Sequence, residues 1–366
     1  MRIAFVVPGR LEARTGGSTY NRRIVEGLRG RGRHVDVVEV DGGFPAPEPD
    51  AVRRLDDALT GLTAATVTVV DGLIFGCAPE VVESHAPRLC LVSLVHLPLA
   101  ADPGRAPDAA AAFRRSEERA LRSATHAVIT GSATRDLLDG YGVPAERITL
   151  VEPGTDRPSA DQFTAAHTAR DRRDGIVRLL SVATLNPGKG HARLLSALAA
   201  TGLSNWHLTC AGSLEHHPQT VADVRGLVRQ LDMATRVTLA GTLDDIGLAE
   251  AYQSADVFVL ATRRETYGMA VSSALAWGLP VVSTRTGAIP SLVGDTAGIV
   301  VPVDDDAALT DALRRILGDA ALRTTLARGA LVAAERLPSW HDQVAAFGRL
   351  LDTLPPTRRH PHPHDH

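Results

Sequence analysis

The 366-residue sequence predicts an α/β protein built from two doubly wound domains with parallel sheets. Short apolar runs rich in valine, isoleucine and leucine alternate with amphipathic stretches, as expected for strands buried on both faces. The length favours two domains over one. The alternation also breaks once, around residues 153–175, and then resumes, which divides the chain into two similar halves.

In the first half, expected strands alternate with expected helices in the order typical of a Rossmann-like domain, which we place at residues 1–157. The strands are expected at Ile3–Val7, His34–Val40, Val67–Val70, Leu89–Val95 and Ala127–Thr130. The helices are expected near Ser18–Arg31, Ala51–Leu62, Ala109–Arg122 and Ala133–Tyr141.

The segment Pro153–Gly175 is polar and proline-containing, has no clear period, and is expected to link the domains. A second Rossmann-like domain is expected at residues 158–337. Its strands are expected at Val177–Ala183, His207–Ala211, Val237–Ala240, Val257–Leu260, Val281–Ser283 and Gly298–Val301. Its helices are expected near His191–Ala200, Thr220–Leu231, Leu248–Ser254, Met269–Trp277, Asp306–Leu317 and Ala320–Arg336. A last helix is expected at about 338–353, and residues 354–366, rich in proline and histidine, are expected to be disordered.

The composition excludes several classes of protein. A formal net charge of −3 argues against a nucleic-acid binder, which is normally basic. The three cysteines have no paired spacing, which fits a reducing cytoplasm and neither a disulfide framework nor a zinc site. The first residues are expected to form a strand, not a signal peptide, and no apolar run approaches the roughly 20 residues that cross a bilayer. We therefore expect a soluble cytoplasmic protein.

Three loops that follow expected strands have the features of a phosphate-binding site. Gly16 and Gly17 open the first helix, where backbone N–H groups can approach a phosphate, although a plain strand-to-helix turn has the same appearance. Lys189 lies between two glycines and can neutralise a diphosphate or simply be an exposed turn lysine. Glu265 precedes Gly268 at a helix start, where it can accept sugar hydroxyls or complement the helix dipole.

Two further candidates lie at expected strand ends in the first half. His96 follows the strand that ends at Val95, and ligands of open α/β sheets bind beyond the carboxyl ends of strands. A structural histidine at the end of a strand is the alternative. Asp71 ends the neighbouring strand and is either a weaker acceptor-side candidate or the cap of the next helix.

The order of these motifs resembles the family-four retaining glycosyltransferases, whose signature is a glutamate, seven residues, and a second glutamate. Here Glu265 matches the first position, and the second holds Ser273. The resemblance implies the GT-B fold, with two Rossmann-like domains facing across a cleft. It also implies that the last helix crosses back to the first domain, that the second domain binds the nucleotide sugar and that the first binds the acceptor.

The resemblance assigns expected roles to individual residues. His96, Lys189 and Glu265 are expected to be catalytic, without a metal or other cofactor. His96 and Asp71 are expected on the acceptor side. The donor, a UDP- or GDP-linked sugar, is expected to be bound by Gly16, Gly17, Thr184, Lys189, Glu265, Tyr267, Gly268, Met269 and Ser273. The expected activity is transfer of a hexose to a hydroxyl of a small-molecule acceptor.

Departures from the family pattern support an alternative function. Ser273 replaces the second glutamate, Thr184 stands at a usual arginine position, Thr266 at a usual glycine and Ser291 at a frequent glutamate. Another basic group, such as Arg263 or Arg264, can substitute for the cation missing at Thr184, but the sequence does not show this substitution. These changes suggest, as the alternative, a catalytically silent pseudo-glycosyltransferase that acts as a binding or regulatory partner.

Two other charged groups of residues have simpler explanations. Asp304–Asp306 lies between an expected strand and helix, so helix capping is preferred to metal binding. The arginines of the first helix region are expected to be a solvated face, with weak membrane-surface contact as the alternative. They are Arg22, Arg23, Arg29, Arg31 and Arg33.

Overall fold

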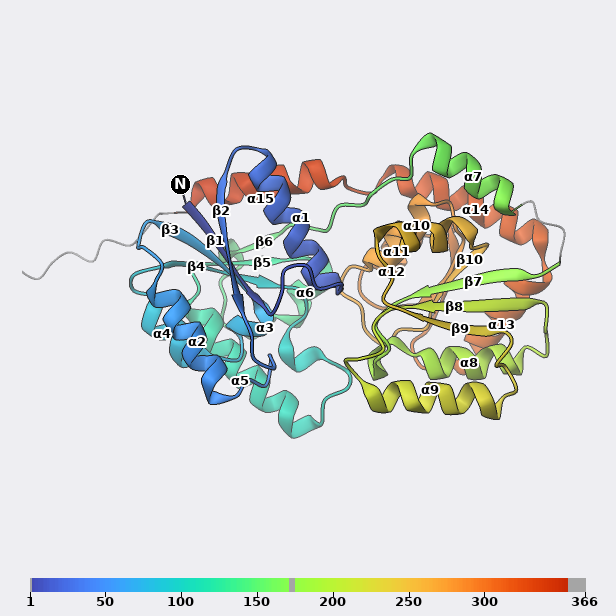
Figure 1. Cartoon of the computed structure of the whole chain (residues 1–366), viewed down its shortest axis with the longest axis horizontal. Helices are drawn as coiled ribbons and strands as arrows, with labels where there is room; N and C mark the ends of the chain where they lie inside the picture. The colour runs from blue at the N-terminus through green and yellow to red at the C-terminus, as the bar shows by residue number, and fades with distance from the viewer. Residues whose placement is uncertain (1, 171–174, 355–366) are drawn as a thin grey trace, which may run out of the picture. The chain divides into compact units, whose positions relative to one another are not determined.

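The computed structural model describes residues 2–170 and 175–354, and the tail expected to be disordered falls outside this range from residue 355. The contacts divide the chain into two compact units (Figure 1). The first runs to Gly154 and includes the segment from Pro338, and the second is Thr155–Leu337. Each unit contains a six-stranded sheet of parallel strands between two layers of helices. The expected α/β class, with two Rossmann-like doubly wound domains, is confirmed.

The sheet of the first unit has the order β2-β1-β3-β4-β5-β6. Its strands are β1 (Arg2–Pro8), β2 (His34–Val40), β3 (Thr66–Asp71), β4 (Cys90–Val95), β5 (His126–Ile129) and β6 (Ile148–Leu150). Its helices are α1 (Gly16–Gly30), α2 (Pro49–Thr60), α3 (Gly72–Phe75), α4 (Pro79–His85), α5 (Pro107–Ser123), α6 (Ser132–Leu137) and α15 (Trp340–Thr353). The order changes direction at β1 and β3, and the loops after these strands lie at the same edge of the sheet.

The alternation of side chains along β1 explains why both faces of this sheet are covered. Ile3 and Phe5 pack in a cluster with residues of α1 and α15, whereas Val6 packs in a second cluster with residues of α2 and α4. Side chains of a strand point alternately to opposite faces, so each face receives its own apolar cluster. Strands β3, β4 and β5 are buried along their whole length.

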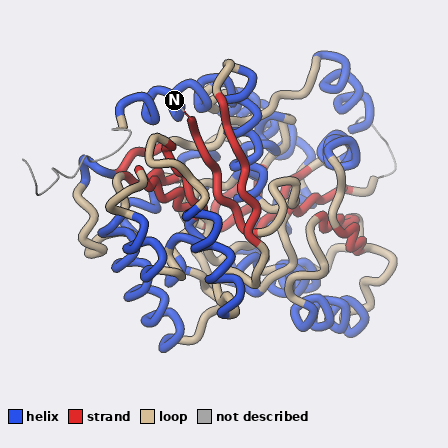
Figure 2. Tube along the Cα trace, turned by 60° about the vertical axis from the view of Figure 1, so that its left-hand side comes forward, coloured by secondary structure: helices blue, strands red, loops and turns tan. Residues whose placement is uncertain are grey.

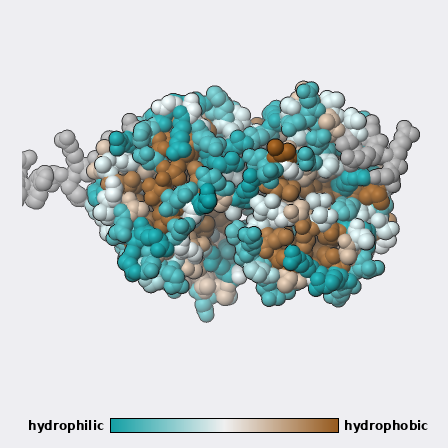
Figure 3. Space-filling view, in the orientation of Figure 1, coloured by the Kyte–Doolittle hydropathy of each residue, from teal (hydrophilic) through white to brown (hydrophobic). Residues whose placement is uncertain are grey.

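Helix α15 packs against α1 in the first unit, and several of the clustered arginines contribute to this contact. A Cβ added to Gly27 of α1 would lie 2.4 Å from Cγ2 of Val344, so glycine allows the close approach of the two helices. Arg31 donates to the backbone oxygen of His341 at 2.8 Å, and Arg33 forms an ion pair with Asp352. Among the described residues, no helix has both the length and the apolar character needed to cross a membrane. On the face drawn in Figure 3, hydrophilic side chains surround separate apolar areas.

The sheet of the second unit has the order β12-β11-β10-β7-β8-β9. Figure 2 draws the strands of both units in red. Those of the second unit are β7 (Val177–Val182), β8 (Trp206–Ala211), β9 (Val237–Gly241), β10 (Val257–Leu260), β11 (Val281–Thr284) and β12 (Gly298–Val301). Its helices are α7 (Ala160–Arg170), α8 (His191–Ala200), α9 (Pro218–Gln230), α10 (Asp245–Ser254), α11 (Met269–Ala276), α12 (Ile289–Val293), α13 (Asp306–Gly318) and α14 (Ala320–Glu335).

The expected linker at Pro153–Gly175 contains a helix, α7, that the sequence pattern did not indicate. The helix has few large apolar residues, and Ala166 is fully buried while Phe163 is only partly buried. Arg170 instead attaches the end of α7, since its guanidinium donates to the backbone oxygens of Ala255 and Trp277 at 2.8 and 3.0 Å. Hydrogen bonds of this kind leave no periodic signal in the sequence.

Candidate ligand-binding residues in each unit

In the second unit, the candidate residues lie on three loops at the carboxyl ends of neighbouring strands. These loops follow β7, β10 and β11, which are adjacent in the sheet. Hydrogen bonds join the first two loops, because Gly188 O accepts from the N–H of Arg263 at 2.7 Å and from the Thr262 hydroxyl at 3.1 Å. The third is joined to the second by the Ala288 N–H, which donates to Thr266 O at 3.2 Å.

Lys189 and Glu265, predicted from separate motifs, form an ion pair in which Lys189 Nζ lies 2.7 Å from Glu265 Oε2. The side chains are 25% and 18% exposed, respectively, so both remain accessible from solvent. Among the described residues, the other carboxylate oxygen of Glu265 has no hydrogen-bond partner. The pair therefore offers one cation and one free acceptor at the same place.

Glycines shape the backbone on both sides of this ion pair. Gly190 has a φ of +69°, and a Cβ there would lie 2.0 Å from Ala261 O. Gly287 has a φ of +55°, and a Cβ there would lie 1.9 Å from Glu265 O. Any other residue at either position would combine an unfavourable backbone conformation with a collision against backbone atoms. The loop carrying Lys189 and the loop carrying Gly287 can thus approach the loop of Glu265 this closely only with glycine at these points.

His191, the first residue of α8, contributes no positive charge beside Lys189. The ring is buried, and burial together with the Lys189 charge lowers its pKa to about 4. Neither ring nitrogen has a hydrogen-bond partner among the described residues. Lys189 is therefore the charged group that this loop presents.

The other residues predicted around Glu265 lie at the start of α11. Gly268 precedes the helix with a φ of +102°, which favours glycine. Tyr267 is buried, and Met269 is partly buried. Ser273 is half-buried, and its hydroxyl donates a hydrogen bond to the buried Tyr252 hydroxyl, which itself donates to the Ala270 carbonyl at 3.2 Å. No motif in the sequence indicates that Tyr252 contributes here.

The two basic residues that precede Glu265 differ in their partners. Arg263 is exposed, and its Nε donates to Asp304 Oδ1 at 3.1 Å. The guanidinium of Arg264 has no hydrogen bond or ion pair among the described residues, although its Nε is buried. Thr184, at the usual arginine position, lies on the loop after β7, where its carbonyl accepts the N–H of Asn186 at 2.9 Å. Of Arg263 and Arg264, only Arg264 has a guanidinium that no carboxylate of the described residues neutralises.

The acidic run before α13 has structural roles. Asp305 caps α13 by accepting the Ala308 N–H at 2.9 Å, as the sequence indicated. Asp304 and Asp306 both form ion pairs with Arg193. No group of three or more potential metal ligands occurs among the residues that the structure describes.

In the first unit, Gly17 lies against His96, although the two are far apart in the sequence. A Cβ added to Gly17 would lie 3.1 Å from His96 Cδ2, whereas one added to Gly16 would meet nothing within 4 Å. Thr15 caps α1 by accepting the Ser18 N–H at 3.1 Å. The ring of Tyr20 packs edge-on against His96, with 5.3 Å between ring centroids.

Asp71 is both the cap of α3 and a partner of His96. Its Oδ1 accepts the Leu73 N–H at 2.9 Å, and its Oδ2 lies 3.5 Å from His96 Nε2. The same Oδ2 accepts a hydrogen bond from Asn21 Nδ2 at 2.7 Å, and Asn21 Oδ1 lies 3.1 Å from His96 Nε2. Sequence reasoning missed Asn21, although a polar residue on the apolar face formed by Ile24 and other residues of α1 is a recognisable signal.

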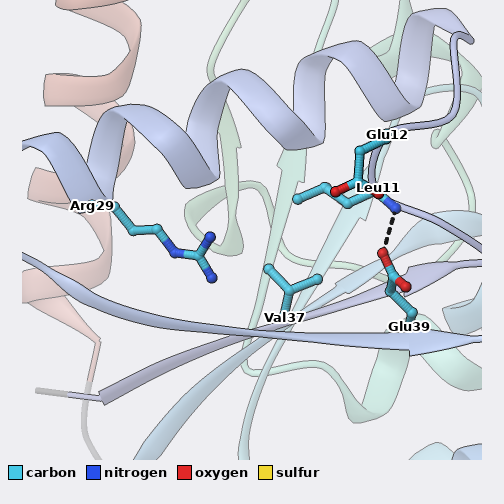
Figure 4. Close-up of a pocket in the computed structure, with 5 residues that line it drawn as sticks. All are labelled: Leu11, Glu12, Arg29, Val37 and Glu39. Atoms are coloured by element: carbon cyan, nitrogen blue, oxygen red, sulfur yellow. Dashed lines mark hydrogen bonds between the residues drawn. The ribbon is translucent and has the colours of Figure 1, made fainter.

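A pocket of about 380 Å³ in the first unit contains none of these candidates. It lies between α1 and β2 and is lined by Leu11, Glu12, Arg29, Val37 and Glu39 (Figure 4). Two of its charged groups are engaged in the protein, because Glu39 accepts the Leu11 N–H at 2.8 Å and Arg29 donates twice to a backbone oxygen. We assign no ligand to it.

Comparison with known proteins gives both units the same class. Residues 14–157 match the family model described as Glycosyltransferase Family 4, and residues 177–319 match that described as Glycosyl transferases group 1. Both units therefore match models of glycosyltransferases, and the two Rossmann-like domains have the GT-B fold.

Among curated proteins, the chain is similar to the D-inositol 3-phosphate glycosyltransferase of Xylanimonas cellulosilytica. The two are 28% identical over 254 residues, which cover 67% of this chain and 60% of that protein. The chain thus spans less than two thirds of the length of this relative.

Solved structures of similar fold cover almost the whole chain. Sucrose-phosphate synthase from Thermosynechococcus elongatus has a TM-score of 0.80 at 22% identity, covering 96% of this chain and 98% of that one. Alr3699/HepE from Anabaena, in complex with UDP-glucose, has a TM-score of 0.76 at 17% identity, covering 97% and 100%. At these identities the likeness concerns the fold.

Proposed function

We propose that the protein is a retaining glycosyltransferase that transfers a hexose from a UDP- or GDP-linked sugar to a hydroxyl of a small acceptor. The observation that carries this proposal is the Lys189–Glu265 ion pair at the carboxyl ends of β7 and β10. It joins a phosphate-binding cation to a sugar-binding carboxylate within one unit. The match of both units to glycosyltransferase models supports the same activity.

In the proposed reaction, the glycosidic bond to the diphosphate opens as the acceptor hydroxyl attacks the same face of the sugar, and the proton of that hydroxyl passes to the departing diphosphate. Negative charge then grows on the leaving diphosphate, and Lys189 and the N–H groups at the start of α11 would stabilise it. The free oxygen of Glu265 would accept a hydroxyl of the transferred sugar. In the first unit, His96 would contact a ligand hydroxyl. The proposal includes no metal.

A diphosphate carries more negative charge than Lys189 alone can balance, because Lys189 is already paired with Glu265. We propose that Arg264 supplies the second cation, in place of the arginine that Thr184 replaces. Its guanidinium is unpaired among the described residues, whereas Arg263 is paired with Asp304. A charged hydrogen bond to phosphate contributes roughly 1.5–3 kcal/mol, which corresponds to at least about tenfold in affinity.

Calorimetry with UDP and GDP tests this assignment with a matched pair of variants. Arg264→Gln is expected to weaken binding of the preferred nucleotide about tenfold, and Lys189→Gln at least as much. The adjacent Arg263→Gln is the control, and its effect is expected to be small because that guanidinium is held by Asp304. Equal losses from Arg263→Gln and Arg264→Gln would show that the unpaired state of Arg264 has no functional meaning.

For the acceptor, we propose a small polyol of the cyclitol class, since curated relatives are named D-inositol 3-phosphate glycosyltransferases. Turnover is tested with UDP-glucose and other UDP and GDP sugars, each with D-inositol 3-phosphate and related polyols. NMR of the anomeric proton in the product reports whether configuration is retained. Absence of transfer, donor hydrolysis and nucleotide binding across the panel would refute the proposed activity. Nucleotide binding without transfer to any acceptor would favour a silent, binding role.

A further inference from the structure

Asn21 lies between Asp71 and His96 and connects them through its two chemically different ends. The amide NH₂ can only donate hydrogen bonds, and the amide oxygen can only accept them. The NH₂ end is 2.7 Å from Asp71 Oδ2, and the oxygen end is 3.1 Å from His96 Nε2. Asn21 is 1% exposed and Asp71 is 4% exposed, so both depend on protein partners for their hydrogen bonds.

The charge of Asp71 fixes the orientation of this amide. Burial opposes ionisation of Asp71, but His96 and the hydrogen bonds from Asn21 and the Leu73 N–H outweigh it, so the pKa of Asp71 lies below its ordinary value. An ionised carboxylate only accepts hydrogen bonds, and the Asn21 NH₂ must therefore face it. The Asn21 oxygen then faces His96, and it can be satisfied only if His96 Nε2 carries a proton.

We propose that Asn21 is a positioning residue that holds His96 with Nε2 protonated and leaves Nδ1 as the ring nitrogen that accepts a hydrogen bond from a ligand hydroxyl. Among the described residues, Nδ1 of His96 has no hydrogen-bond partner. The ring is held on its other sides by Tyr20 and by the close approach of Gly17. The identity of the hydroxyl, that of a sugar or polyol, rests on the proposed function, whereas the protonation of the ring does not.

The position of Asn21 supports a specific role over simple packing. It lies on the buried face of α1 with Ile24, Val25 and Leu28, where an apolar residue would complete the hydrophobic stripe. A buried amide costs free energy unless its hydrogen bonds are made. Here the bonds are made to an ionised carboxylate and a histidine ring, which points to control of the ring.

Nitrogen-15 NMR of the imidazole rings in the full chain tests the proposal directly. The chain has 14 histidines, so the His96 signals are identified by their loss in His96→Gln. We expect the neutral ring of His96 to carry its proton on Nε2 and to have no proton on Nδ1. Loss of the proton from Nε2 in the wild-type protein would overturn the proposal, and this measurement needs no variant.

Two variants separate the role of the amide from that of packing. Asn21→Leu keeps the volume but not the hydrogen bonds, and the preference for a protonated Nε2 is expected to disappear. Tyr20→Phe, which removes the hydroxyl bonded to Val151 O but keeps the ring against His96, is the control and is expected to preserve it. The signals of His126, bonded to Thr149, are expected to be unchanged in both. An unaltered His96 pattern in folded Asn21→Leu would overturn the role of Asn21, because Asp71 would then suffice.

Turnover provides the functional measurement. With an active donor and acceptor pair, Asn21→Leu is expected to lower kcat roughly tenfold, which is the lower end of the effect of removing a group that orients a metal-bound histidine. Equal kcat values for Asn21→Leu and wild type would show that ring protonation does not matter for transfer. If no pair is active, the proposed function fails while the NMR result still decides the protonation of His96.

Discussion

Replacing Glu117 by glutamine is expected to make the stability of the first unit less sensitive to rising pH. Glu117 lies on α5 and is 1% exposed, and its Oε2 accepts the Leu99 N–H at 3.0 Å. Burial raises the pKa of Glu117 to about 8, against the opposing effects of that bond, of the Tyr141 hydroxyl, and of the Arg105 and Arg114 charges. Glutamine keeps the shape and an acceptor for the Leu99 N–H but has no proton to lose.

The expected magnitude follows from the two protonation equilibria of Glu117. In the unfolded chain its carboxyl ionises near its ordinary pKa of 4.5, and in the folded unit it stays protonated until about pH 8. Below about pH 4.5 both states are protonated and the carboxyl has no pH-dependent effect. Between these values the free energy of unfolding falls by roughly 1.4 kcal/mol per pH unit, to a total on the order of 4–5 kcal/mol. Between about pH 5 and pH 7, the free energy of unfolding of Glu117→Gln should therefore rise by roughly 2–3 kcal/mol relative to that of the wild type.

Urea unfolding followed by circular dichroism, at several pH values from about 5 to 8, measures this difference. Glu146→Gln, at an exposed carboxylate of the same unit, is the matched control for removal of a negative charge. Parallel pH profiles for the wild type and Glu117→Gln would refute the reasoning, because they would mean that Glu117 ionises equally easily in both states. If the free energy of unfolding of Glu117→Gln is below that of the wild type by the same amount at every pH, the variant has only lost a hydrogen bond.

Two further predictions concern the candidate residues themselves. Gly17→Ala is expected to lower kcat/KM roughly tenfold, because the added methyl group displaces the His96 ring. Gly16→Ala, with open space around its Cβ, should retain activity. Steady-state kinetics of the two variants tests this prediction, and equal effects on kcat/KM would exclude the ring contact as the cause. Ser273→Glu should tighten UDP or GDP binding by about 1–3 kcal/mol in calorimetry if the missing carboxylate is the defect. The same change should lower the free energy of unfolding by about 1 kcal/mol, because Tyr252 loses its hydrogen bond with Ser273. Unchanged or weaker binding would show that position 273 does not contact the nucleotide.

Much of the fold could be predicted because its sheets are buried on both faces. The strands His34–Val40, Val257–Leu260 and Gly298–Val301 have the expected bounds, since continuous apolar runs leave little choice of structure. Short elements were missed. Strand β6 has three partly buried residues, and α3 has four residues, which is too short for a helical period to be visible.

The candidate residues could be found from the sequence where a motif carries them, but their partners could not. Lys189 and Glu265 are 76 positions apart, and only the parallel order of β7 and β10 brings their side chains to 2.7 Å. The partner of Ser273, Tyr252, comes from a different helix with no motif of its own. Sequence patterns report local periodicity and turn chemistry, whereas these contacts are set by which strands are neighbours.

The hydrogen bonds separate the two carboxylates that the sequence placed together as candidates. Both oxygens of Asp71 are used inside the protein, by Asn21, the Leu73 N–H and His96, and the side chain is 4% exposed. A ligand hydroxyl could bond to Asp71 only by displacing a partner, which would leave a buried polar group unsatisfied at a cost of about 1–3 kcal/mol. Glu265, in the second unit, is more exposed and has a free oxygen, so a ligand hydroxyl gains a charged hydrogen bond there at no such cost. Asp71 is therefore better suited to act through His96 than on a ligand, and Glu265 is the carboxylate suited to direct contact.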